Sequence, residues 1–383
     1  MKRWYLVLLC LSLLLSGCGG WANGSYVSVR PHQEQSAEDN VEGIEAENAS
    51  QLQSAMEALI ERGTEQAVIA VPNYPTEQLQ TDSAQVIRYL TRDFPVGAYA
   101  VDRISYDFGT SGGHPAIALR ISYVHTRAEI RSIKQAGSLE EAKNLLYEAL
   151  DNCESGLVMQ VAHYRQTDFT QLVADYCTAY PEKVMEQPEV SAALYPESAV
   201  RPVVELKFTY QTSRDTLRNM KKQVSPVFDA AVLYVSGDAS DHTKLVQLYS
   251  FLMERFDYQQ ETSITPAYSL LRHGVGDSRA FATVYAAMCR LAGLECQVVT
   301  GTRDGAPYCW NMVRDGDRYC HVDLLRSLNS GGMTEYADSA MSGYVWDYSR
   351  FPACEEPEQQ PEETQPEEPT VPETTADETL PEA

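Results

Sequence analysis

An internal repeat constrains the fold of this 383-residue chain more than any other feature. The segment Leu119–Tyr123 recurs as Leu206–Tyr210, and the apolar run Ala67–Val71 recurs as Leu157–Val161. The separations of the two matches differ by only a few residues, as expected for a duplicated unit with small insertions. A long period present in two copies predicts a pair of duplicated modules rather than a solenoid.

Each copy predicts a small α/β module in the order helix, strand, helix, strands, helix. We place the first module at residues 49–136 and the second at residues 137–224. Their last helical segments are expected to end at Lys134-Gln135 and at Lys222-Gln223. Neither copy contains a phosphate loop or a paired nucleophile and base. We therefore expect a spacer or binding role for the modules, although the sequence does not identify a ligand.

The N-terminal residues predict an export signal. Met1-Lys2-Arg3 is followed by an apolar stretch, Trp4–Leu15, which is shorter than a membrane-spanning helix. The stretch ends in Leu-Ser-Gly before Cys18, which resembles the signal of bacterial lipoproteins. An ordinary secretory signal that happens to contain a cysteine is the alternative.

The resemblance implies that residues 1–17 are removed and that Cys18 becomes an acylated first residue. Residues 18–48 are then a lipid-anchored tether, because they are rich in Gly, Ser, Gln and Glu and show no periodicity. The protein is expected on the extracytoplasmic face of the cell membrane, with the membrane as its partner through the lipid anchor.

The formal net charge of −24 is concentrated at the C-terminus. Residues 355–383 contain eleven acidic residues, six prolines and no Lys or Arg, which predicts a disordered tail. Because the rest of the chain is also acidic, we expect no nucleic-acid partner. The chain lacks Cys-x-x-Cys, His-Glu-x-x-His and P-loop motifs, so we expect no metal and no cofactor.

The third unit, residues 225–354, is predicted to contain two helices followed by antiparallel strands. His242–Phe256 places apolar side chains on one helical face, and Gly293 ends a second helix that starts near Arg279. Strands are expected at residues 295–301, 307–313 and 318–324.

A hairpin signal sets the expected pairing of the last two strands. Asp315-Gly316 is typical of a two-residue type I′ turn, which would pair Arg314 with Asp317. Tyr308 would then lie opposite Asp323, and Trp310 opposite His321, on one face of the hairpin.

Three motifs in this unit resemble the transglutaminase-like (papain-like) domain of bacterial surface proteins. Gly274–Ala282 resembles Gly-x-Gly-x-Cys-x-x-Tyr/Phe-Ala, Tyr308–Asn311 resembles His-Ala-Trp-Asn, and His321–Asp323 matches His-Val-Asp. The family's cysteine falls on Ser278, its histidine on Tyr308 and its aspartate on Asp323. The resemblance implies an α+β fold in which a C-terminal transglutaminase-like domain follows the two α/β modules.

The two replacements remove the chemistry that the resemblance would otherwise imply. A thiol at a helix N-terminus has a lowered pKa and gives its proton to the imidazole, which the aspartate orients. A serine hydroxyl ionises far less readily, and a tyrosine phenol is protonated near neutral pH and is a poor base. No catalytic residue is therefore expected, and Ser278, Tyr308 and Asp323 are triad-equivalent positions.

Three readings of this domain remain open on the sequence alone. It is a pseudoenzyme that binds peptide or cell-wall material, a structural domain, or a residual hydrolase or acyl-transferase that uses Ser278 with His321 or His273 as base. His321 lies about 7 Å along the strand from the family's base position, which is too far for a direct substitute. In the first reading the cleft contacts are expected from Trp310, Asn311, His321 and Trp346.

Overall fold

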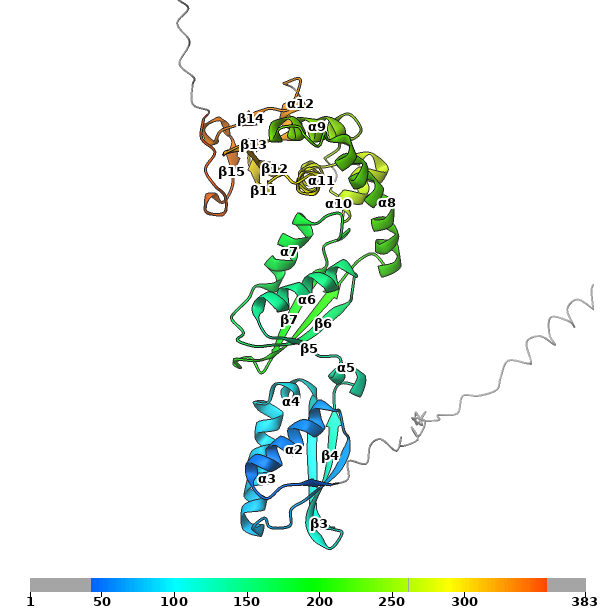
Figure 1. The fold of residues 1–383 in the computed structure, drawn as a ribbon, viewed down its shortest axis with the longest axis vertical. Coiled ribbons are helices and arrows are strands. Elements are labelled where there is room, and N and C mark those ends of the chain that lie inside the picture. Colours follow the sequence, from blue (N-terminus) through cyan, green and yellow to red (C-terminus); the bar gives the residue numbers. More distant parts are fainter. Residues whose placement is uncertain (1–42, 261, 329, 357–383) are drawn as a thin grey trace, which may run out of the picture.

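The computed structural model describes residues 43–260, 262–328 and 330–356. The predicted signal, Cys18, most of the tether and the tail beyond Glu356 lie outside the described residues. Within the described ranges, no helix combines the length and the hydropathy needed to cross a membrane. Three units follow one another along the long axis of the molecule, with the N-terminal module at one end and the C-terminal domain at the other (Figure 1).

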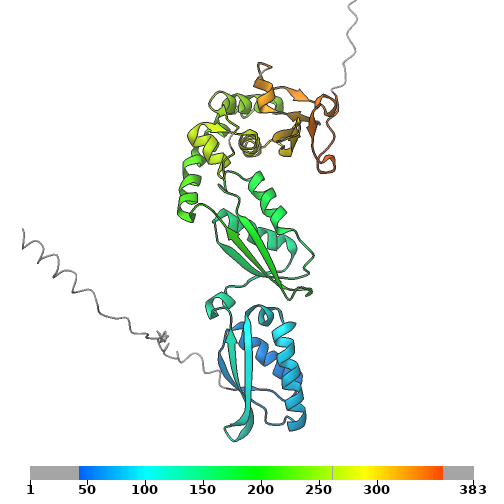
Figure 2. The same ribbon diagram turned by 180° about the vertical axis from the view of Figure 1, so that it is seen from behind.

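The two modules have the same sheet topology. In each, two parallel strands lie beside an antiparallel pair, and the main helices cover one face of the sheet (Figures 1 and 2). The first sheet has the order β1-β2-β4-β3 and the second the order β5-β6-β8-β7. The mixed α+β class expected from the sequence is confirmed. The elements of the first module are β1 (Ile44–Glu45), α2 (Ala49–Glu61), β2 (Gln66–Ala70), α3 (Thr76–Arg92), α4 (Pro95–Ala100), β3 (Val101–Ser111), β4 (His114–Tyr123) and α5 (Arg127–Arg131). Those of the second are β5 (Lys134–Ala136), α6 (Leu139–Asp151), β6 (Gly156–Val161), α7 (Phe169–Ala179), β7 (Glu189–Tyr195) and β8 (Val203–Thr209).

The two sheets have the same strand register at the residues that the sequence repeat aligns. Ala67 of β2 pairs with Leu119 of β4, and Leu157 of β6 pairs with Leu206 of β8. The helices that precede these strands begin in the same way, because the Asn48 side chain caps α2 and the Ser138 side chain caps α6. The repeat therefore extends from sequence to strand register and helix capping.

The beginnings of both modules differ from the boundaries drawn on the sequence. Ile44–Glu45 forms β1 beside β2, so the tether cannot reach residue 48. Lys134–Ala136 forms β5 in the second sheet, where a helix end at Lys134-Gln135 was expected. These short strands were missed because two or three residues are too few to show a periodicity. The helix expected to end at Lys222-Gln223 continues to Tyr234, across the boundary drawn at residue 224.

The C-terminal domain contains one buried helix packed on a five-stranded sheet. Helix α11 is buried along most of its length and lies against one face of the sheet, whose order is β14-β13-β12-β11-β15. The segment after α12 returns to the other face and builds a second core around Trp310, Tyr344 and Trp346. The elements are α8 (Arg214–Tyr234), α9 (Asp241–Met253), β9 (Asp257–Tyr258), α10 (Pro266–Tyr268), η2 (Ser269–His273), β10 (Val275–Gly276), α11 (Ser278–Leu291), β11 (Cys296–Arg303), β12 (Ala306–Asp315), β13 (Arg318–Val322), α12 (Leu324–Leu328), β14 (Glu335–Tyr336), η3 (Asp338–Ala340), β15 (Tyr344–Val345) and η4 (Tyr348–Arg350).

The predicted register of the β12–β13 hairpin is wrong by one step. Asp315 pairs with Arg318, and Met312 pairs with His321. Gly316 occupies the first loop position with φ +61°, and Asp317 at the second loop position does not have a positive φ. This combination fits a type II′ turn, whereas the expected type I′ turn needs a positive φ at both positions. In the observed register, each residue of β12 faces a β13 residue two positions away from its predicted partner. Because side chains alternate between the two faces with a period of two, Tyr308 and Trp310 keep their expected face.

Candidate functional site

Ser278 is the first residue of α11, as the motif predicts. Asp277 caps the helix through a 2.9 Å hydrogen bond from the Ala280 N–H. Gly276 allows the close approach of this turn, because a Cβ there would lie 2.8 Å from the Ala280 Cβ. The Ser278 Oγ accepts a 3.3 Å hydrogen bond from the Cys309 N–H of β12, so the hydroxyl faces the hairpin.

Asp323 follows β13 and is the acceptor for five hydrogen bonds. Its Oδ1 accepts from the Tyr308 hydroxyl at 3.0 Å and from the N–H groups of Leu325 and Arg326 at 3.1 Å each. Its Oδ2 accepts from the Tyr344 hydroxyl at 2.5 Å and from the Arg303 guanidinium at 3.2 Å. Asp323 is 1% exposed, and these donors compensate for the burial of its carboxylate.

The phenol of Tyr308 takes the place that the motif assigns to a base, and it cannot act as one. Burial, together with the negative charge of Asp323 and the hydrogen bond to it, raises the pKa of Tyr308 far above its ordinary value. The protonated phenol donates to Asp323 and leaves no basic atom for Ser278. Sequence reasoning missed Arg303 and the role of Tyr344, because both reach Asp323 only through the folded sheet.

His321 is fully buried and both of its ring nitrogens have partners. The Trp310 Nε1–H donates to His321 Nδ1 at 3.0 Å. Since an indole nitrogen can only donate, Nδ1 must be the acceptor, and Nε2 carries the proton toward Asp338 Oδ1 at 2.9 Å. Burial lowers the pKa of His321, although the Asp338 carboxylate opposes this. His321 is therefore a neutral residue of the core.

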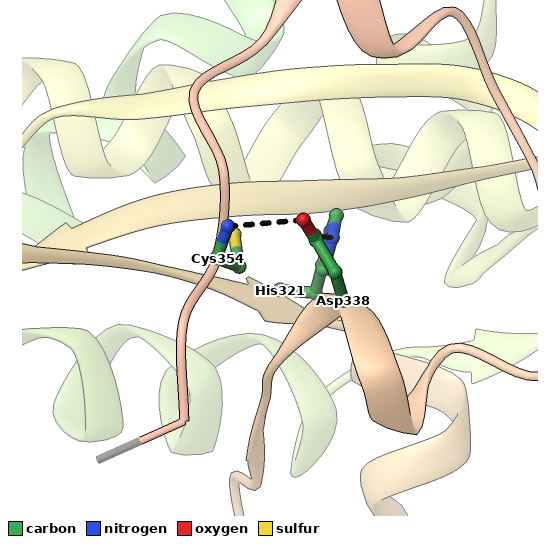
Figure 3. Close-up of side chains that lie close together, drawn as sticks. All are labelled: His321, Asp338 and Cys354. Carbon is green, nitrogen blue, oxygen red and sulfur yellow. Dashed lines mark hydrogen bonds and ion pairs between the residues drawn. The ribbon is translucent and has the colours of Figure 1, made fainter. Parts of the chain in front are cut away.

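His321, Asp338 and Cys354 lie close enough together to suggest metal ligation (Figure 3). The tautomer argues against a metal, because coordination at Nε2 requires a proton on Nδ1, which would then face the Trp310 N–H. Burial also raises the pKa of the Cys354 thiol to about 12. The Cys354 N–H donates to Asp338 at 3.2 Å, so this cluster fastens the C-terminal segment to the sheet.

The four side chains predicted to contact a cleft ligand are buried instead. Trp310 is 1% exposed, Asn311 and His321 are 0% exposed, and Trp346 is 7% exposed. Asn311 joins α11 to the sheet through a 2.9 Å hydrogen bond to the Ala282 carbonyl. The segment after α12 covers Trp310 and His321 on one face of the sheet, whereas α11 covers Asn311 on the other, so these side chains do not line the cleft described below.

A cleft of about 800 Å³ opens beside Ser278. It is bounded by α7 of the second module, by one side of α11 from Ser278 to Arg290, by β11 and the start of β12, and by residues 347–351. Tyr308 and Cys309 line it next to Ser278, whereas no histidine lines it within the described residues. The site is thus shared between the second module and the C-terminal domain, which the sequence did not predict.

Contacts between side chains hold the two sides of the cleft together. Arg350 pairs with Asp175 of α7 at 3.2 Å, and Arg279 donates to Gln187 at 2.9 Å. Arg290, which lines the cleft, pairs at 2.7 Å with Glu182, which lies just outside it. The arginines that border the cleft therefore already have partners.

Comparison with known proteins identifies the C-terminal domain. The Transglutaminase-like superfamily matches residues 229–324, so the chain carries a transglutaminase-like domain there. Among curated proteins no match is found.

Three solved structures are similar to parts of the chain. A transglutaminase has 11% sequence identity and a TM-score of 0.26, covering 59% of this chain and 68% of its own. A candidate cysteine protease from Cytophaga hutchinsonii has 14% identity and a TM-score of 0.25, covering 41% and 70%. A candidate protease from Parabacteroides distasonis ATCC 8503 has 9% identity and a TM-score of 0.23, covering 67% and 39%.

Proposed function

We propose that this chain is a cell-surface lipoprotein whose transglutaminase-like domain is non-catalytic and binds peptide or cell-wall material in the cleft beside Ser278. The observation that carries the proposal is that both carboxylate oxygens of Asp323 already accept hydrogen bonds from the protein. The carboxylate that would orient a base receives hydrogen bonds from Tyr308, Tyr344 and Arg303. A nucleophile beside this arrangement has no group to take its proton.

The hydrolase alternative requires a histidine within reach of Ser278. His321 is fully buried and already bonded to Trp310 and Asp338. His273 is exposed and packs edge-on against Tyr268, outside the residues that line the cleft. Neither geometry supplies a general base to the Ser278 hydroxyl.

Activity-based labelling tests the absence of catalysis. We expect that a fluorophosphonate probe does not label the wild type more than Ser278→Ala. A thiol probe run in parallel needs Cys296→Ser and Cys309→Ser as controls, because both cysteines line the cleft. Fluorophosphonate labelling that disappears in Ser278→Ala would contradict the proposal.

Titration with muropeptides and with synthetic peptides separates a binding domain from a structural one. Ala174 of α7 lines the cleft, and a tryptophan there fills part of the space. A ligand of this cleft should bind the wild type and lose its affinity for Ala174→Trp. Equal affinity for both proteins would place binding elsewhere and leave the structural reading.

A further inference from the structure

The edge of β11 that faces the cleft is open over most of its length. On its inner side β11 pairs with β12 from Cys296 to Arg303. On its outer side it pairs with β15 only at Thr302 and Arg303. Among the described residues, no strand pairs with the outer edge between Cys296 and Gly301.

The ladder with β12 determines which main-chain groups point into the cleft. The Arg314 N–H donates to the Glu295 carbonyl at 3.0 Å, so this pair is hydrogen-bonded. In an antiparallel ladder such pairs alternate with pairs that bond outward. Cys296, Val298 and Thr300 therefore direct their N–H and C=O groups away from β12, and all three residues line the cleft.

The charged side chains of the cleft favour a ligand recognised through uncharged groups. Arg279, Arg290 and Arg350 are balanced by Asp175, Asp277 and Asp347 among the lining residues. Each arginine has a partner on the protein, so the cleft is not built for a phosphate or a free carboxylate. The alternating N–H and C=O groups of Val298 and Thr300 match the repeat of an extended peptide.

We propose that an extended peptide segment of a partner protein adds to the edge of β11 at Val298 and Thr300, with α7 of the second module as the opposite wall. The inference rests on the proposed cleft-binding function and specifies its ligand as peptide main chain. The volume of about 800 Å³ lies within the usual range for ligand sites. Alternate side chains of the peptide would point toward α7, where Gln171 and Asp175 line the cleft.

Proline substitution at Val298 tests the edge directly. The Val298 N–H points outward, so Val298→Pro removes a donor for the ligand while the bonds to β12 remain. Val298→Ala is the matched control, because it trims the side chain and keeps the N–H. The probe is a fluorescein-labelled decapeptide selected from a random phage-displayed library against the full chain. A copy of the probe that is N-methylated at alternate residues tests the same bonds without changing the protein, should Val298→Pro fail to fold.

We expect the probe to bind about tenfold more weakly to Val298→Pro, within twofold of wild type to Val298→Ala, and not measurably to Ala174→Trp. N-methylation in one of the two alternate phases should weaken binding at least tenfold. Strand addition would be overturned if binding is lost in Ala174→Trp but is unchanged by Val298→Pro and by N-methylation. That result would leave the cleft function intact. Failure to select any peptide, while chitooligosaccharides or muropeptides bind the cleft, would also overturn it. Peptide binding that is unaffected by Ala174→Trp would refute both proposals.

Discussion

The hydroxyls of Tyr308 and Tyr344 should stabilise the C-terminal domain through Asp323, and their removal measures how much. Hydrogen bonds to charged groups contribute about 1.5–3 kcal/mol each. Tyr344 is 7% exposed, and its loss leaves only Arg303 on Oδ2. Tyr308 is half-buried, and its loss leaves two N–H donors on Oδ1. We therefore expect Tyr344→Phe to lower the free energy of unfolding by about 2–3 kcal/mol and Tyr308→Phe by about 1.5 kcal/mol.

Urea denaturation followed by tryptophan fluorescence is a suitable assay. Trp310 and Trp346 pack in the same core as Tyr344, with the Trp310 and Tyr344 ring centroids 5.1 Å apart. In the protein from Cys18 onward, a Trp21→Phe background confines the signal to this domain. The double tyrosine variant should lose an amount different from the sum of the single losses, because both hydroxyls act on one carboxylate.

Tyr319→Phe is the control on the same hairpin. The Tyr319 hydroxyl donates to Glu295 at 2.8 Å in a solvent-exposed hydrogen bond, and its removal should leave the urea midpoint unchanged. Losses below about 0.5 kcal/mol for both Tyr308→Phe and Tyr344→Phe would refute the argument that their hydroxyls compensate for a buried charge.

The pH dependence of the same variants gives a second measurement. Burial and the negative charge of Asp323 raise the pKa of Tyr308 and of Tyr344 above the ordinary value of 10.0. A group whose folded pKa is raised contributes its full stability below the unfolded pKa and loses it as the pH rises. The wild type should lose stability above about pH 10, and the double phenylalanine variant should lose less over that range. Parallel curves for the two proteins would contradict the assignment.

Three further predictions concern the active-site motif and the ends of the chain. In a Cys309→Ser background, Ser278→Cys alone should react slowly with iodoacetamide at pH 7, whereas adding Tyr308→His should accelerate alkylation about tenfold or more. Equal alkylation rates for the two variants would count against the triad equivalence. Cys18→Ser should release the protein from the membrane fraction or leave its signal uncleaved, and unchanged fractionation with an unchanged mature mass would contradict lipidation. Deleting residues 357–383 should change the free energy of unfolding by less than about 1 kcal/mol, and a larger loss in urea denaturation would mean that the tail packs on the domains.

The features that the sequence predicted well are those encoded by neighbouring residues. Asp277 and the apolar run after it specify the start of α11 at Ser278. The alternating strands of the hairpin gave the correct face for Tyr308 and Trp310. The repeat alignment matched Ala67 to Leu157 and Leu119 to Leu206. In the structure Ala67 pairs with Leu119 as Leu157 pairs with Leu206, because the duplicated segments have the same register.

The features that the sequence did not predict depend on distant contacts. Trp310 looked like a cleft residue because nothing in its own strand shows that residues 338–354 return to cover it. Asp175 borders the site only because α7 of the second module lies against the C-terminal domain. Arg303 precedes a turn and matches no motif, although its guanidinium reaches Asp323.

Asp323 has a structural role that does not depend on catalysis, and this changes how its presence should be interpreted. It lies immediately before α12, and its Oδ1 accepts from the Leu325 and Arg326 N–H groups, as an N-cap does. The same carboxylate joins β12 and β15 to that helix through Tyr308 and Tyr344. Replacing it would leave the two tyrosine hydroxyls and the helix N–H groups without this acceptor, which is costly whether or not the domain is catalytic. An aspartate at this position therefore indicates an intact fold, and evidence for catalysis must come from positions 278 and 308.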